Sequence, residues 1–151
     1  MEVFRITRDI YANAIVASGA AYRWNFDQQW VVYTASSRSL ATLELVVRRS
    51  GVKPNFPYKV MVISLADEEH FVTSIREKDL PDNWRSVKAY KTLQQMGSDW
   101  YNSRKSLLLR VPSSVIPKEY NYIINTRHPD YPENVALVRQ EGYVWDERLM
   151  G

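Results

Sequence analysis

Six short runs rich in β-branched and aromatic residues limit the folds that are open to this chain of 151 residues. Runs of this composition favour strands, and here they are separated by stretches with helical spacing. The predicted strands cover residues 2–7, 30–35, 58–65, 106–111, 121–125 and 143–149, and the predicted helices cover 10–18, 37–50 and about 89–103. The length is typical of one domain, and the sequence has no repeat and no convincing linker. We therefore expect a single α+β or α/β domain with strands in excess.

Composition argues against several classes of protein. The chain has no cysteine, so it has neither disulfides nor a thiolate metal site. No apolar run approaches the roughly 18 residues of a membrane span, and the first residues, "MEVFRITRD", lack the pattern of a signal peptide. The cytoplasm is therefore the expected location. A net charge of +3 is too small for a typical nucleic-acid-binding surface, but it suits a site for a phosphorylated small molecule.

Glu44 is an unusual charge in the amphipathic helix predicted over residues 37–49. It lies within or at the edge of an apolar stripe at helical spacing, formed by Leu40, Leu43 and Val47. One interpretation is a solvated residue that pairs with Arg48, four positions later. The other is a functional carboxylate that lines a cleft, because a buried carboxylate is costly unless it has a partner or a task. The pattern alone favours neither.

Arg23 and Tyr33 are candidates for ligand contacts. Arg23 follows the small residues "ASGAA", which would let main chain and a guanidinium approach a phosphate together. The simpler interpretation is an arginine stacked on Trp24 or Trp30 at the surface. Tyr33 lies in a predicted strand, where a tyrosine is most often core but can also stack on an aromatic ligand.

Ser113, Ser114 and His128 lie in predicted loops. No nucleophile-elbow motif surrounds the serines, so a hydroxyl that binds phosphate, or a simple turn serine, is expected in place of a catalytic triad. His128 and His70 are the only histidines, and their spacing is not that of metal ligands. A structural hydrogen bond is the simplest role for His128.

Ten short elements along the chain resemble one known family when they are taken in order. They are "FRITR", "SGA", "RWN", "VVYTA", "LATLE", "LPDNW", "GSDW", "VPSSVIPKEYNYIIN", "HPD" and "WDERL". Their number and order resemble the RES-domain family, whose members are toxins of bacterial toxin–antitoxin pairs and are named for an Arg, a Glu and a Ser. The resemblance covers nearly the whole chain and implies one RES domain over residues 1–151. It also implies an α+β fold with an ADP-ribosyltransferase-like central sheet and flanking helices.

The resemblance assigns site positions to seven residues of this chain. The three residues of the family name fall on Arg23, Glu44 and Ser113, and the remaining substrate-binding positions fall on Arg5, Tyr33, Asn121 and His128. Two departures from the family pattern affect the expectation. The loop before Arg23 is shorter than usual and carries Tyr22, and Thr126 stands where the family often has proline.

The activity that the resemblance implies is cleavage of the bond between nicotinamide and ribose in NAD+. The acceptor of the ADP-ribose would be water or inorganic phosphate, and the alternative is a protein side chain. Glu44 would stabilise the oxocarbenium-like ribose, and Ser113 would bind phosphate or ribose. Arg5 and Arg23 would bind the pyrophosphate, and Tyr33 would stack on nicotinamide. Neither a metal nor a cofactor is expected, because NAD+ is the substrate.

The resemblance also implies a protein partner. We expect an antitoxin with an Xre-type helix-turn-helix region that covers the active site, and no direct contact of the toxin with nucleic acid or a membrane. A non-catalytic interaction domain is a third hypothesis. The joint presence of Arg23, Tyr33, Glu44 and Ser113 argues against it.

Overall fold

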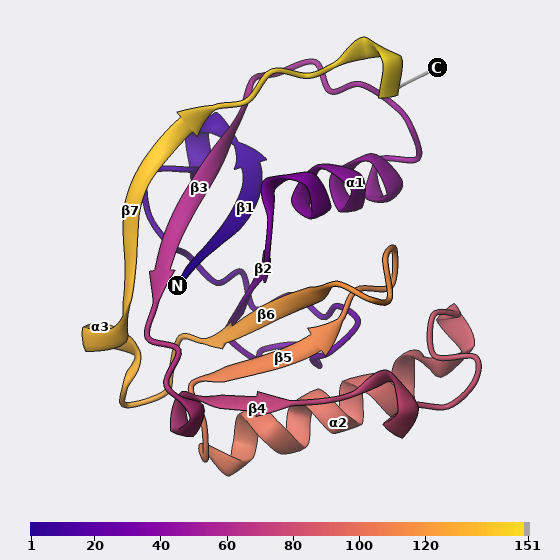
Figure 1. Cartoon of the computed structure of the whole chain (residues 1–151), viewed down its shortest axis with the longest axis vertical. Helices are drawn as coiled ribbons and strands as arrows, with labels where there is room; N and C mark the ends of the chain where they lie inside the picture. Colours follow the sequence, from indigo (N-terminus) through magenta and orange to yellow (C-terminus); the bar gives the residue numbers. More distant parts are fainter. Residues whose placement is uncertain (150–151) are drawn as a thin grey trace.

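A seven-stranded sheet runs through the computed structural model, which describes residues 1–149 (Figure 1). The strands are β1 (Glu2–Arg8), β2 (Val31–Ala35), β3 (Tyr58–Leu65), β4 (Val72–Ser74), β5 (Leu108–Pro112), β6 (Tyr120–Asn125) and β7 (Val135–Gly142). Their order in the sheet is β4-β5-β6-β2-β1-β3-β7. All neighbours are antiparallel except β4 and β5. With its few helices, this mixed sheet confirms the α+β class.

The sheet is nearly divided between β1 and β2. These two strands pair at a single position, Phe4 with Ala35, whereas β1 pairs with β3 along its whole length. Beyond that one pair, β1 and β2 diverge, and we call this opening in the sheet the fork. In Figure 1, β1, β3 and β7 run steeply in the upper part of the molecule, and β4, β5 and β6 run almost across it below.

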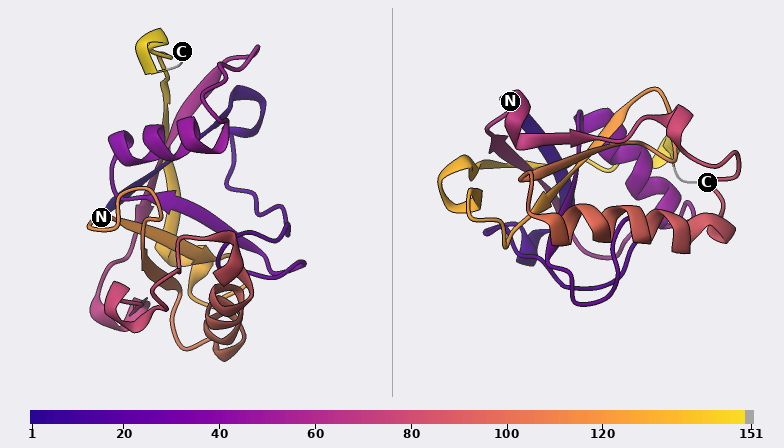
Figure 2. Two further views of the ribbon diagram at one scale, coloured as in Figure 1. Left: turned by 90° about the vertical axis from the view of Figure 1, so that its right-hand side faces the viewer. Right: turned by 90° about the horizontal axis from the view of Figure 1, so that it is seen from below.

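Each half of the sheet carries its own helix (Figure 2). Helix α1 (Arg38–Arg48) begins at Ser37, whose side chain accepts a hydrogen bond from the Leu40 amide at 3.1 Å. It packs on β1 and β3 through a cluster that includes Phe4, Ile6, Leu40, Leu45, Val60 and Val62. Helix α2 (Tyr90–Ser103) packs on β5 and β6 through Trp24, Leu93, Trp100, Leu109 and Ile123.

A third cluster joins the two halves and includes Val3, Val32, Met61, Ile63, Leu108 and Ile124. The remaining helices are short: α3 spans Tyr131–Asn134, and single 3-10 turns lie at Asp9–Tyr11, Glu69–Phe71, Glu77–Asp79, Val87–Ala89 and Glu147–Leu149. Within residues 1–149 no helix has the length and apolar character needed to cross a membrane.

Two predicted elements are wrong. The helix expected over residues 10–18 is one 3-10 turn followed by loop, because Ile10, Tyr11 and Val16 have no core to pack against and are exposed. The strand expected over 143–149 is unpaired, and the strand β7 precedes it instead. The aromatic residues that suggested a strand, Tyr143 and Trp145, pack against the α1 cluster from an irregular segment.

The buried face of α1 also differs from the predicted stripe. Leu40, Ala41 and Leu45 are buried, whereas Leu43 and Val47 are 36% and 59% exposed. The buried face of α1 therefore shares Leu40 with the predicted stripe, but it continues through Ala41 and Leu45 in place of Leu43 and Val47. Glu44 lies at the boundary between core and solvent.

Candidate active site

A cavity of about 340 Å³ lies where β1 and β2 separate. Its walls are built from β1, β2, α1, the loop around Arg23, the segment 112–115 that ends β5, Asn121 on β6 and Tyr90 at the start of α2. This volume is within the usual range for small-molecule sites, about 300–1,000 Å³. The fork in the sheet thus creates the site, because two strands paired along their length would close it.

Glu44 reaches into this cavity from α1 and is held by two donors. Its Oε2 accepts a hydrogen bond from Ser113 Oγ at 2.8 Å, and its Oε1 accepts one from Asn121 Nδ2 at 2.9 Å. Among the ion pairs of residues 1–149 none involves Glu44, so the pairing with Arg48 considered from the sequence does not form. The carboxylate is thus fixed by neutral donors from β6 and from the loop after β5.

Burial raises the pKa of Glu44 above its ordinary value. The two hydrogen bonds, and then the charges of Arg48 and Arg23, act in the opposite direction and lower this pKa, but burial prevails. The carboxylate is therefore less strongly ionised than a free glutamate at the same pH.

Ser113 is buried, and its exposed fraction is 0%. Its Oγ donates to Glu44 and accepts from the main-chain amides of Val115 at 3.1 Å and Ile116 at 3.2 Å. The neighbour that lines the cavity is Ser114. The structure therefore places Ser113 behind the carboxylate, as a residue that positions Glu44, and gives it no access to a ligand in the cavity.

Asn121 both lines the cavity and fixes its shape. Its Nδ2 donates to Glu44 and to the main-chain oxygen of Thr34 at 3.2 Å. One side chain on β6 thereby links the carboxylate of α1 to the main chain of β2.

Arg5 lies on β1 at the point where the fork opens. Its guanidinium donates to the main-chain oxygen of Tyr33 at 3.0 Å and so links β1 to β2 next to their one paired position. Burial and then the charge of Arg48 lower the pKa of Arg5, but an arginine remains charged in a protein.

Arg23 lines the cavity from the loop that precedes β2. It donates to the main-chain oxygens of Trp84 at 3.2 Å and Arg85 at 3.3 Å, and its guanidinium carbon is 4.9 Å from the ring centroid of Tyr90. The surface stacking on Trp24 or Trp30 considered from the sequence is thus replaced by a cation–π contact with Tyr90.

Tyr33 presents its ring to the cavity while its hydroxyl is used by the protein. The hydroxyl donates to Asn25 Oδ1 at 2.6 Å and accepts from the Trp24 amide at 3.0 Å. Its ring meets that of Tyr22 edge-on, with centroids 5.6 Å apart. Burial raises the pKa of Tyr33, so the phenol stays neutral and is not a base.

His128 does not reach the cavity. It is buried near the end of α2, where its Nδ1 accepts from the Asp130 amide at 3.1 Å and its Nε2 donates to the oxygen of Arg104 at 2.8 Å. Both ring nitrogens are occupied, so the structure supports a structural hydrogen-bonding role for His128 and gives no support to the substrate contact expected from the resemblance.

The cavity also contains residues that the sequence did not single out as site residues, namely Tyr22, Arg48 and Tyr90. Arg48 follows Glu44 by one helical turn, and that spacing was the available signal. Tyr90 is remote in sequence from the other walls and gave no local signal.

The cavity wall carries three arginines, one carboxylate and three tyrosine rings. Among the described residues no cluster of three or more His, Asp or Glu side chains is arranged to hold a metal. Such a wall suits an anionic ligand that bears a flat ring.

Comparisons with known proteins agree with this architecture. A family model described as the RES domain matches residues 2–146. The protein "Toxin Res" of Yersinia enterocolitica is 33% identical over 127 residues, which are 84% of this chain and 82% of that protein. The "Prs ADP-ribosylating toxin" of a Sphingobium species is 35% identical over 130 residues, with coverages of 85% and 80%.

A solved structure shares the fold. The crystal structure of the M. tuberculosis MbcT–MbcA toxin–antitoxin complex contains a chain that matches with a TM-score of 0.73 at 15% identity, over 95% of this chain and 84% of that one. The match of the family model over almost the full length, with relatives above 30% identity, decides the question of family. The chain belongs to the RES-domain family of toxins.

Proposed function

We propose that this protein is a toxin that depletes NAD+ by cleaving its nicotinamide–ribose bond, with water or inorganic phosphate as the acceptor of ADP-ribose. The observation that carries the proposal is the fixed carboxylate of Glu44 in a cavity with three arginines and three tyrosines. An adenine dinucleotide supplies the matching features, which are a pyrophosphate, two riboses and flat bases.

The chemistry requires stabilisation of a cationic sugar more than acid catalysis. Nicotinamide in NAD+ is already a cationic leaving group, and bond breaking leaves positive charge on the ribose carbon and its ring oxygen, as in glycoside hydrolysis. Glu44 would stabilise that charge electrostatically. Because Ser113 and Asn121 already hold its two oxygens, little reorganisation is needed during the reaction.

The remaining walls would bind the rest of the substrate. Arg5 and Arg23 would bind the pyrophosphate, for which a planar guanidinium is well shaped. The ring of Tyr33 would stack on nicotinamide, and Asn121 would contact the ribose. In this scheme no metal or resident cofactor takes part.

A second candidate function is transfer of ADP-ribose to a protein. The Sphingobium relative carries the name of an ADP-ribosylating toxin, and it is 35% identical to this chain. The donor site would be the same in both cases, so only the acceptor separates the two candidates.

We also propose an antitoxin partner that covers the cavity in the cytoplasm. The relative from Yersinia is named as a toxin, and the solved structure that shares the fold is a toxin–antitoxin complex. An Xre-type helix-turn-helix protein is the partner we propose. The toxin itself would bind neither nucleic acid nor a membrane.

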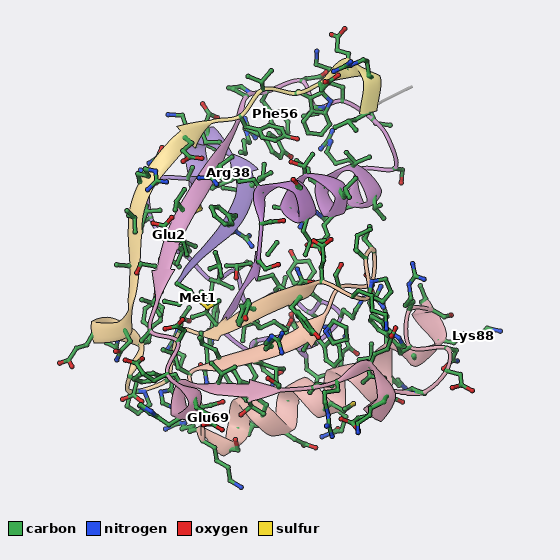
Figure 3. The ribbon with its side chains drawn as sticks, viewed as in Figure 1. Met1, Glu2, Arg38, Phe56, Glu69 and Lys88 are labelled. Atoms are coloured by element: carbon green, nitrogen blue, oxygen red, sulfur yellow. The ribbon has the colours of Figure 1, made fainter. Side chains whose placement is uncertain are left out.

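The test is a measurement of nicotinamide release by the purified chain, with and without phosphate. We expect Glu44→Gln to lower kcat about 100- to 1,000-fold, the loss typical of removing one electrostatic group. The matched control is Glu69→Gln, an exposed change that Figure 3 shows well away from α1. Full activity of the Glu44→Gln variant would contradict the proposal. Nicotinamide release that depends on added protein, with ADP-ribose found on that protein by mass spectrometry, would favour the second candidate.

A further inference from the structure

Asn25 is a buried residue next to the cavity, and its side chain makes three hydrogen bonds. It is 1% exposed and does not line the cavity, yet all of its side-chain hydrogen-bonding groups are occupied. Its Oδ1 accepts from the Tyr33 hydroxyl at 2.6 Å, and its Nδ2 donates to the main-chain oxygens of Ala20 at 2.9 Å and Phe26 at 2.8 Å. One side chain thereby closes the loop of residues 20–26 on itself and fixes it to β2.

The Tyr33 hydroxyl completes this attachment. It accepts from the Trp24 amide at 3.0 Å while it donates to Asn25, so it holds two consecutive residues of the loop. In addition, the Tyr22 amide donates to the main-chain oxygen of Asn25 at 3.3 Å and keeps the tip of the loop narrow. Arg23 occupies that tip.

Arg23 is held at both ends. Its guanidinium donates to two main-chain oxygens of the 84–85 segment, at 3.2 and 3.3 Å, and lies 4.9 Å from the ring centroid of Tyr90. Its main chain is held through the next two residues, because the Tyr33 hydroxyl bonds the Trp24 amide and the Asn25 side chain. The position from which the Arg23 side chain extends is therefore set by Asn25 and Tyr33.

We infer that Asn25 and the Tyr33 hydroxyl form a positioning pair that fixes Arg23 relative to Glu44 and so sets the affinity for the pyrophosphate of the substrate. The inference rests on the proposed function for the identity of the substrate. It divides Tyr33 into two parts: the ring belongs to the wall of the cavity, and the hydroxyl acts through Arg23. Neither Asn25 nor this hydroxyl touches the substrate.

The test is a set of steady-state measurements on Asn25→Ala and Tyr33→Phe. Each change removes the shared bond, and the loss of this one buried bond is expected to raise the KM for NAD+ about three- to tenfold, with kcat within twofold. Asn25→Ala also removes the bonds to Ala20 and Phe26, and Tyr33→Phe the bond from the Trp24 amide, so these values are lower bounds for the rise in KM. The double variant is expected to raise KM by less than the product of the two single effects, because both changes remove the bond between Tyr33 and Asn25. In an Arg23→Gln background neither change is expected to raise KM further.

Tyr101→Phe is the matched control. Its hydroxyl accepts from the Trp30 amide at 3.2 Å, which is the same kind of bond on the segment that leads into β2, but Tyr101 does not line the cavity. The Tyr101→Phe variant is expected to have the same KM for NAD+ as the unchanged protein. If Asn25→Ala does not fold, Tyr33→Phe decides the question alone, because it removes the same bond and keeps the ring.

Two outcomes would overturn the inference. One is a KM penalty of Asn25→Ala or Tyr33→Phe that persists in full in the Arg23→Gln background. The other is a fall in kcat with an unchanged KM. If the unchanged protein releases no nicotinamide, the proposed function fails, and titration with inorganic pyrophosphate decides the positioning pair separately. Equal losses of pyrophosphate affinity in Arg23→Gln and Asn25→Ala would support it, and unchanged affinity in Asn25→Ala would overturn it.

Discussion

At the scale of single residues, opposing effects act on the pKa of the Glu44 carboxyl group. Its burial favours the neutral form, whereas Ser113, Asn121 and the arginines around it favour the charged form. A carboxylate with this role must be charged to stabilise a cationic sugar. The arginines of the cavity wall therefore have a second effect beside any contact with an anion, since they offset part of the cost of burying Glu44.

Arg48→Gln is expected to change the pH dependence of activity. The charge of Arg48 lowers the pKa of Glu44, so its removal raises that pKa and shifts the acidic limb of kcat/KM to higher pH. Activity on the alkaline side of this limb should change much less. The measurement is kcat/KM for NAD+ between pH 4 and 8.

Arg49→Gln is the control for this prediction. Arg49 is the next residue, and its Nε donates to the oxygen of Val52 at 2.9 Å, but it does not line the cavity. An equal shift in both variants would show that general surface charge causes the effect. No shift in either variant would remove Glu44 as the group that controls the acidic limb.

Single residues also show what the sequence could predict of the site. The structure brings Arg5, Arg23, Tyr33, Glu44 and Asn121 to one cavity, as the resemblance implied. It does not bring the Ser113 hydroxyl or His128 there. Which group a serine hydroxyl faces depends on contacts between residues distant in sequence, here over 69 positions, and a local pattern contains no information about them.

At the scale of elements, a glycine fixes the distance between α2 and the loop that carries Arg23. A Cβ atom built on Gly97 would lie 1.7 Å from the main-chain oxygen of Trp24. That oxygen belongs to main chain and cannot rotate away. Only glycine allows α2 to approach the loop this closely.

Gly97→Ala is therefore expected to destabilise the protein, although alanine is by itself about 1 kcal/mol better than glycine within a helix. The expected loss of unfolding free energy is about 3 kcal/mol, the upper part of the range for overpacking. The KM for NAD+ should also rise, because the loop must move. Urea unfolding measures the first effect and steady-state kinetics the second.

The control is Gly142→Ala at the end of β7, where an added Cβ atom meets nothing within 4 Å. This variant should unfold within about 0.5 kcal/mol of the unchanged protein. A Gly97→Ala variant more stable than the unchanged protein would contradict the close approach of α2.

The elements differ in how well the sequence predicts them. Helices α1 and α2 and all the strands except β4 and β7 lie within two residues of their predicted bounds, because each buries an apolar face. Strand β7 is a sheet edge with mostly exposed side chains, so its alternation is too weak to predict it. Strand β4 has three residues and gave no pattern.

At the scale of the whole molecule, the raised pKa of Glu44 links the stability of the fold to pH. Between the ordinary pKa of glutamate, about 4.3, and its higher value in the folded protein, the folded state binds more protons than the unfolded state. Stability from this group is therefore present at low pH and is lost as the pH rises through the folded-state pKa.

Glu44→Gln removes this titration. As the pH rises from 4 to 7, the difference in unfolding free energy between the two proteins is expected to shift in favour of the glutamine variant. Urea unfolding of both proteins at several pH values measures this difference, and the other titrating groups largely cancel in it. A shift in favour of the unchanged protein would mean that Glu44 is stabilised as an anion in the fold.

The fork between β1 and β2 has a consequence for how this family can diverge. Each half of the sheet has its own helix and its own cluster of buried side chains, and a single residue pair, Phe4 with Ala35, joins β1 to β2. Insertions and substitutions that change the angle between the halves would leave the clusters under α1 and α2 intact and would have to repack the third cluster, which joins the halves. We therefore expect homologues to differ in cleft width mainly through rotation about this junction. New acceptor preferences would then require repacking at the junction and no change in the clusters under α1 and α2.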